Sequence, residues 1–202
     1  MSRIVAAIGA LVLIQVFAWF ETTVAGSPEL KSDLFDPGPL KPIDSQTKLR
    51  EGQPAPDFTL RATDGRQIAL SAYRGHSNVV LSFIPAAWTP VCSDQWPGYN
   101  LAAGLFKEYN AVLIGIATDN VPTLWAWTRE MGKLWFPVVS DFWPHGQVAE
   151  RYGVLRGDGM AERALVFIDI HGVVAHIHVS DINVRPKLEL IREQLKRMQA
   201  GS

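Results

Sequence analysis

The chain has 202 residues, and 19 basic residues against 20 acidic ones give it a formal net charge of -1. A charge this close to zero argues against a nucleic-acid binder held by phosphate contacts, because such a protein needs a basic excess. Hydrophobic residues make up 48% of the chain, which excludes a disordered polar tail. The single cysteine excludes an intramolecular disulfide, a CxxC redox pair and a multi-cysteine zinc site.

The first predicted element is an apolar helix near the N-terminus. Arg3 precedes residues 4–20, among which only Gln15 is polar. At 1.5 Å per residue this stretch forms about 25 Å of helix, at the short end for a bilayer span. Residues 1–25 are therefore an uncleaved signal anchor, a signal peptide cleaved near Thr23-Val24-Ala25, or a buried helix of the fold. The first two interpretations export the rest of the chain, as a membrane-anchored or periplasmic protein.

Residues 26–50 are predicted to be a Pro-rich linker. Four prolines fall in this stretch, at positions 28, 37, 39 and 42. Prolines remove backbone donors and disfavour helix in the residue before them, so we expect a mostly extended segment. Residues 51–202 are enough for one domain with a well-buried core.

Apolar runs alternate with helical stretches in this domain, which predicts an α/β fold with a central mixed sheet flanked by helices. The expected strands are 57–61, 67–70, 78–84, 111–117, 138–140, 164–170 and 173–179. The expected helices are 92–109, 122–131, 146–152 and 186–199. Tight turns at Asp64-Gly65 and His171-Gly172 join the first and last strand pairs. Pro97 predicts a kink near the start of the long helix.

Cys92 lies where the strand 78–84 gives way to this long helix. In open α/β sheets, functional sites form at the carboxyl ends of strands. The unpaired N–H groups of a helix N-terminus also favour an anion. A free cysteine of pKa about 8.5 is only about 3% thiolate at pH 7, so a nucleophilic thiol needs such help. From position alone, Cys92 is either a buried structural residue or a nucleophile.

The segment around Cys92 resembles the active-site loop of the peroxiredoxins, the alkyl hydroperoxide reductase and thiol-specific antioxidant family. The family's spacing of Pro, three residues, Thr, two residues, Cys is matched by Pro85, Thr89 and Cys92. Arg163 takes the place of the family's active-site arginine. Further matching segments follow the family order, at residues 52–60, 70–75, 136–141 and 148–154. The resemblance covers about residues 51–180 and implies a thioredoxin-like fold and a thiol-dependent peroxidase.

The resemblance also implies a role for each residue of the loop. The Thr89 hydroxyl would donate to the thiolate or the peroxide, and Arg163 would supply positive charge and hydrogen bonds. The N–H groups of Val91 and Cys92 would stabilise the departing oxygen as an oxyanion hole does. Pro85 would shield the thiolate from water. Taken singly, Thr89 could be only a helix cap and Pro85 only the end of a strand.

Trp88 lies inside the same loop and is expected to line the peroxide entrance or a dimer contact. Peroxiredoxins commonly pair through surfaces near this loop, so the resemblance implies a homodimer. His171, His176 and His178 lack an acidic or cysteine partner at ligand spacing, so they are interpreted as exposed strand residues. The sequence predicts neither a metal nor a cofactor.

Positions where relatives carry a second cysteine hold other residues here. They are Gln95, Pro97 and the C-terminal residues 199–202. The chain therefore resembles the one-Cys form, in which an external thiol or protein reductant reduces a sulfenic acid at Cys92. Hydrogen peroxide and organic hydroperoxides are the expected substrates. Two alternatives are open: a membrane-tethered redox sensor, and an exported thiol-disulfide oxidoreductase of the cytochrome-maturation kind, which the missing CxxC disfavours.

Overall fold

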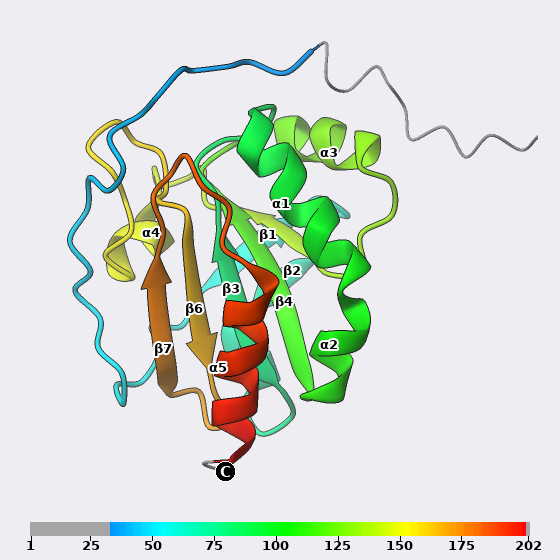
Figure 1. Ribbon diagram of the computed structural model, residues 1–202, viewed down its shortest axis with the longest axis vertical. Coiled ribbons are helices and arrows are strands. Elements are labelled where there is room, and N and C mark those ends of the chain that lie inside the picture. Colours follow the sequence, from blue (N-terminus) through cyan, green and yellow to red (C-terminus); the bar gives the residue numbers. More distant parts are fainter. Residues whose placement is uncertain (1–32, 201–202) are drawn as a thin grey trace, which may run out of the picture.

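The computed structural model describes residues 33–200, which form one mixed sheet with helices on both faces (Figure 1). The strands are β1 (Thr59–Ala62), β2 (Gln67–Ala69), β3 (Asn78–Phe83), β4 (Ala111–Ala117), β5 (Val138–Ser140), β6 (Ala164–Ile168) and β7 (Val174–Val179). The helices are α1 (Pro90–Leu101), α2 (Ala103–Glu108), α3 (Val121–Glu130), α4 (Gln147–Arg151) and α5 (Leu188–Ala200). A 3-10 helix at Leu70–Tyr73 follows β2.

The predicted apolar helix over residues 4–20 lies outside the described residues. The same holds for the cleavage site near Ala25. Within residues 33–200, no helix combines the length and the apolar character that crossing a membrane requires.

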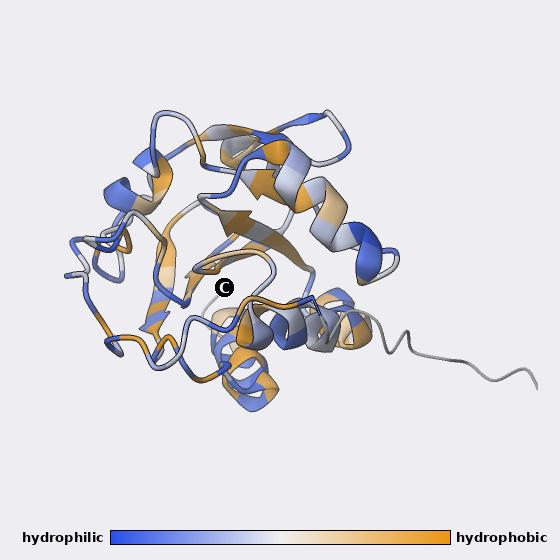
Figure 2. Cartoon of the chain, turned by 90° about the horizontal axis from the view of Figure 1, so that it is seen from above, coloured by the Kyte–Doolittle hydropathy of each residue, from blue (hydrophilic) through white to orange (hydrophobic). Residues whose placement is uncertain are grey.

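The sheet has the order β2-β1-β5-β4-β3-β6-β7. Its three central strands, β3, β4 and β5, are parallel, and the outer strands add antiparallel pairs on both sides. This confirms the predicted mixed α/β sheet. Figure 2 shows the hydrophobic strands at the centre of the molecule, between helices whose outer faces are more polar.

Strand β3 is buried on both faces because it lies between two hydrophobic cores. Val79, Leu81 and Phe83 point into the core that α4 covers. Val80 points into the opposite core, to which α1, α2, α3 and α5 contribute side chains. Period-two alternation along a strand places Ser82 on this second face. A hydroxyl group is thus buried next to α1.

Most predicted elements lie within two residues of their observed bounds, but the long helix 92–109 was wrong. The segment forms two helices, α1 and α2. The helical structure is interrupted at Ala102 and not near Pro97. Pro97 lies inside α1. At the break, the Ala102 N–H donates to the Tyr99 carbonyl, which also accepts from the Trp135 indole at 3.3 Å. The Tyr99 carbonyl at the end of α1 is thus satisfied by a neighbouring N–H group and by a side chain remote in sequence.

The C-terminal helix begins at Leu188, two residues later than predicted, so Pro186 precedes it. The hairpin of β6 and β7 forms at the predicted turn, where Gly172 has a φ of 81°. The expectation of exposed strand histidines was wrong for His176 and His178, which are half-buried in β7. His176 Nδ1 lies 2.6 Å from Glu51 Oε1. This contact gives that histidine a structural partner.

Residues 33–50 contain no helix or strand, but they are bonded to the domain. In Figure 1 they pass along the outside of the sheet, beyond β7. The Ile182 N–H donates to the Pro42 carbonyl at 3.0 Å, and the Phe35 N–H donates to the Trp88 carbonyl at 2.8 Å. We call residues 35–45 the strap. The strap therefore has fixed contacts on the domain, whereas residues 26–32 of the predicted linker lie outside the described residues.

One prediction concerns the docking of α1 on the sheet. Gly115 in β4 pairs with Ser82 in β3, and a Cβ on Gly115 would lie 2.7 Å from the fully buried Trp96 ring. Gly115→Ala should therefore destabilise the fold by about 1–3 kcal/mol, because the indole has to move. Gly104 in α2 has no atom within 4 Å of such a Cβ, so Gly104→Ala should stabilise by up to about 1 kcal/mol.

Urea denaturation of wild type and both variants measures the difference in the free energy of unfolding. Equal stability of the two variants would show that Trp96 does not pack on Gly115 as the structure has it.

Candidate active site

Cys92 is the third residue of α1, and its side chain is fully buried. Thr89 is the N-cap residue, and the Ser93 N–H makes the first helical bond, to the Thr89 carbonyl. Val91 and Cys92 lie in the turn between them, where helix geometry leaves N–H groups without an intrahelical partner. The sulfur therefore lies at the positive end of a helix that starts right after β3 and its short loop.

Arg163 lies directly before β6 and its guanidinium reaches the sulfur. The Arg163 side chain is 2% exposed, and its Nη2 lies 3.4 Å from Cys92 Sγ. Nε donates to the Ile182 carbonyl at 2.8 Å, and Nη1 donates to Gln95 Oε1 at 2.6 Å. None of the ion pairs found within residues 33–200 involves Arg163. Its positive charge is thus available to an anion at Cys92.

Hydrogen bonds to β3 hold Gln95 in place behind Arg163. Gln95 Nε2 and Trp96 Nε1 both donate to Ser82 Oγ at 3.1 Å. All three side chains are fully buried. The Gln95 amide therefore has its nitrogen fixed by β3 and its oxygen turned toward Arg163. This chain of bonds orients the guanidinium from the side of the sheet.

The loop between β3 and α1 is held by bonds of its own. The Thr89 hydroxyl donates to the Ala86 carbonyl at 2.9 Å, so in this structure it does not donate to Cys92. The Ala87 N–H donates to Asp119 Oδ2 at 2.9 Å. Burial raises the pKa of Asp119, and the hydrogen bond from Ala87 opposes that shift. Trp88 has a φ of 60°, in the left-handed region that non-glycine residues rarely adopt.

A mostly apolar pocket of about 560 Å³ opens next to this site. Four of the residues predicted from the sequence line it, namely Pro85, Thr89, Val91 and Arg163. Cys92 does not line it, because its side chain is fully buried beside Arg163. Access of a small molecule to the sulfur therefore requires a small displacement of these walls.

Trp88 does not line this pocket, contrary to one of the two expectations for it. Its ring packs against the core that contains Cys92, and its backbone carbonyl accepts from the Phe35 N–H. Phe35 lines the pocket in its place. The other expectation, a dimer contact at Trp88, stays a prediction.

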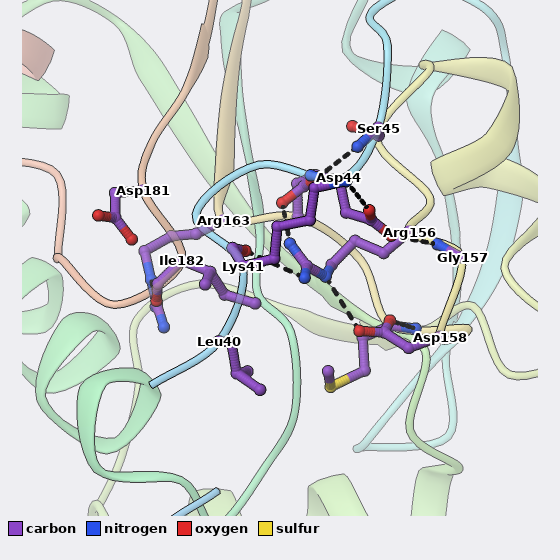
Figure 3. Close-up of polar contacts among 12 residues, drawn as sticks. Leu40, Lys41, Asp44, Ser45, Arg156, Gly157, Asp158, Arg163, Asp181 and Ile182 are labelled. Atoms are coloured by element: carbon purple, nitrogen blue, oxygen red, sulfur yellow. Dashed lines mark hydrogen bonds and ion pairs between the residues drawn. The ribbon is translucent and has the colours of Figure 1, made fainter. Parts of the chain in front are cut away.

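A buried ion pair lies next to the site in sequence and attaches the strap. Glu162 is fully buried, and its Oε2 accepts from Arg156 Nη1 at 2.9 Å. Its Oε1 accepts from the N–H groups of Asp44 at 2.6 Å and Ser45 at 2.8 Å. Figure 3 shows Arg156 bonded to Asp158 and to the Lys41 carbonyl at the same junction. Glu162 is thereby satisfied by partners other than Arg163.

Gln95 and Ser82 are positioning residues that the sequence did not predict. Gln95 follows Cys92 by three positions, so both lie on one face of α1, and this spacing could have indicated a contact. Ser82 is the single polar residue within the apolar part of β3, which is a signal of a buried hydrogen bond. The strap residues gave no such signal, because an irregular Pro-rich segment has no periodicity.

The site thus combines a fully buried cysteine at a helix N-terminus, a buried arginine on its sulfur and a neighbouring pocket, an arrangement suited to thiol-based redox chemistry. Similarity to known proteins identifies the family to which this site belongs. Residues 51–177 match the model of the AhpC/TSA family. This chain therefore belongs to the AhpC/TSA family, the peroxiredoxins, which are thiol-dependent peroxidases.

Individual relatives agree with this assignment. The chain is 35% identical over 127 residues to alkyl hydroperoxide reductase E of Mycobacterium tuberculosis, covering 62% of this chain and 82% of that protein. It is 36% identical over 167 residues to peroxiredoxin-1 of Gallus gallus, covering 77% and 81%. The crystal structure of the reduced 2-Cys peroxiredoxin of Plasmodium vivax aligns with a TM-score of 0.70 at 26% identity, covering 75% and 83%. The fold is thioredoxin-like, as the resemblance implied.

Proposed function

We propose that this protein is a one-Cys peroxidase that reduces hydrogen peroxide and organic hydroperoxides through a sulfenic acid at Cys92. The observation that carries the proposal is the 3.4 Å contact between Arg163 Nη2 and Cys92 Sγ in a buried site. The one-Cys mechanism is supported by the sequence, which holds no cysteine besides Cys92. The comparisons give no support to a redox sensor or to a thiol-disulfide oxidoreductase.

The oxidation step transfers two electrons from sulfur to the peroxide. The Cys92 thiolate attacks the terminal oxygen of the hydroperoxide, so an S–O bond forms as the O–O bond breaks. The sulfur becomes a sulfenic acid, and the departing alkoxide or hydroxide takes up a proton to give an alcohol or water. Arg163 lies where it can donate to the reacting oxygens, and the first-turn N–H groups of Val91 and Cys92 can stabilise the departing oxygen.

The reduction step uses an external thiol. That thiol attacks the sulfenic acid, releases water and leaves a mixed disulfide with Cys92, which a second thiol then cleaves. A direct disulfide between two copies of the chain is disfavoured relative to this mixed disulfide, because both sulfurs would then be buried, whereas a small external thiol has to reach only one buried sulfur. Pairing into a homodimer through surfaces near the loop remains part of the proposal.

Replacement of Cys92 tests the function. Cys92→Ser should abolish peroxide reduction, because the serine hydroxyl is not ionised near pH 7, while the fold survives. The double variant Cys92→Ser, Ser93→Cys is the matched control. It restores a thiol one residue further along α1, at a side chain that accepts from Trp127 Nε1 and has no bond to Arg163. Peroxide consumption with excess thiol should be lost in both variants.

Oxidised wild type should carry a sulfenic acid at Cys92 that dimedone traps, as detected by mass spectrometry. Peroxide turnover by Cys92→Ser above a few per cent of wild type would show that another group reduces peroxide. A Cys92–Cys92 disulfide as the main reversible product would contradict the one-Cys mechanism.

We further propose that the domain acts outside the cytoplasm. The proposal rests on the sequence of residues 1–25, a basic start followed by an apolar stretch. The full chain should fractionate with membranes or be trimmed near Ala25. Deletion of residues 1–25 should yield a soluble, active enzyme, because the strap and the domain are retained. Failure of the shortened chain to fold would show that the apolar stretch belongs to the domain.

A further inference from the structure

The pocket beside the site is built partly by residues that precede the family match. That match begins at residue 51, whereas Phe35 to Leu40 of the strap line the pocket. Met160 and Ile182 face the same pocket from the domain. One wall of the pocket therefore belongs to a segment that precedes the residues matched by the family model.

The strap is fixed in place along its length. The Phe35 N–H donates to the Trp88 carbonyl. The Asn183 side chain makes two hydrogen bonds to the backbone of Leu40. Asn183 Oδ1 accepts from the Leu40 N–H at 3.1 Å, and Asn183 Nδ2 donates to the Leu40 carbonyl at 2.9 Å. The Asp44 N–H donates to the buried Glu162 carboxylate. Three attachment points on different parts of the domain make this wall a built feature of the site.

The chemistry of the pocket changes from its mouth to its inner end. Phe35, at 71% exposure, marks the mouth, and Arg163, at 2% exposure, marks the inner end. Between them the walls are mainly prolines, Leu40, Met160 and Ile182. Arg163 and Thr89 are the polar groups toward the inner end, whereas Asp36 and Asn183 line the exposed part, where their side-chain oxygens accept from the N–H groups of Gly38 and Leu40. A molecule with one polar, reactive end and one apolar chain fits this gradient, with its reactive end toward the sulfur.

We infer that this pocket takes the hydrocarbon chain of an organic hydroperoxide, and that Phe35 and Leu40 of the strap are specificity-determining residues. The inference rests on the proposed peroxidase function and assigns a substrate preference to it. The –OOH group lies at the Arg163 end, and the chain R extends along the strap toward Phe35. Each buried methylene then adds to the binding of the transition state, which hydrogen peroxide cannot gain.

A chain-length series measures this directly. Reduced full-length protein is mixed with hydrogen peroxide and with n-alkyl hydroperoxides from ethyl to decyl, and single-turnover oxidation is followed by tryptophan fluorescence. In wild type, the rate constant should rise with chain length by up to about fourfold per methylene, the equivalent of about 0.8 kcal/mol, until the pocket is filled.

The strap variants carry the decisive comparison. Phe35→Ala and Leu40→Ala should each lower the ratio of the decyl to the hydrogen peroxide rate constant by about tenfold. Phe142→Ala and Leu101→Ala are matched controls, because these side chains are exposed and lie outside the pocket, and they should keep the wild-type ratio. Asn183→Ala removes the two hydrogen bonds to the Leu40 backbone, so it should also lower the ratio of the decyl to the hydrogen peroxide rate constant.

Three results would overturn the inference. The first is a wild-type rate constant that is independent of chain length while hydrogen peroxide reacts normally, which would leave the proposed function intact. The second is an equal ratio in the strap variants and their controls. The third comes from a parallel series in which the sulfenic acid is reduced by alkanethiols of increasing chain length. If only that reduction rate depends on chain length, the pocket binds the reductant and not the peroxide. Absence of oxidation by every peroxide would overturn the proposed function itself, and the inference with it.

Discussion

The buried guanidinium of Arg163 is the group on which the rest of the site depends. Desolvating a positive charge is costly unless it is paired and hydrogen-bonded. Here two nitrogens of Arg163 donate to the Ile182 carbonyl and to the Gln95 side-chain oxygen, and the third lies 3.4 Å from Cys92 Sγ. The neighbouring carboxylate of Glu162 is bound to Arg156 instead. The charge is therefore left facing the Cys92 sulfur, which is the geometry that the proposed function uses.

The fold brings these groups together from separate parts of the chain. The parallel strands β3 and β4 place Ser82 beside Gly115, and the Trp96 indole packs over that pair. This contact seats α1 so that Cys92 faces the start of β6. On the outer side, the strap is bonded to Glu162 and closes one wall of the pocket. Stability and site geometry thus share the same contacts.

Local pattern was enough to predict much of this arrangement. Buried apolar runs predicted β3 and β4, and the resemblance to the peroxiredoxins, carried by the spacing of Pro85, Thr89 and Cys92, predicted the loop at the end of β3. Apart from the bonds of Gln95 and Ser82 near Cys92, the interactions that the sequence did not predict join residues far apart in the chain. The bond between Asp44 and Glu162 spans 118 positions, and the Trp135 indole that donates to the last turn of α1 lies 36 positions from its acceptor. No periodicity or propensity encodes such contacts.

We propose that Arg163 contributes to the reaction with peroxide as well as to ionisation of the Cys92 thiol. The most direct test of this proposal is the single-turnover rate of Cys92 oxidation by hydrogen peroxide, measured at a pH high enough to ionise the thiol completely in every variant. Arg163→Met should then react about 100-fold or more slowly than wild type, since a fixed donor to the reacting oxygens is lost. Arg163→Lys should be intermediate, because it keeps the charge without the planar fork. An Arg163→Met protein that is folded and reacts as fast as wild type under these conditions would contradict the account.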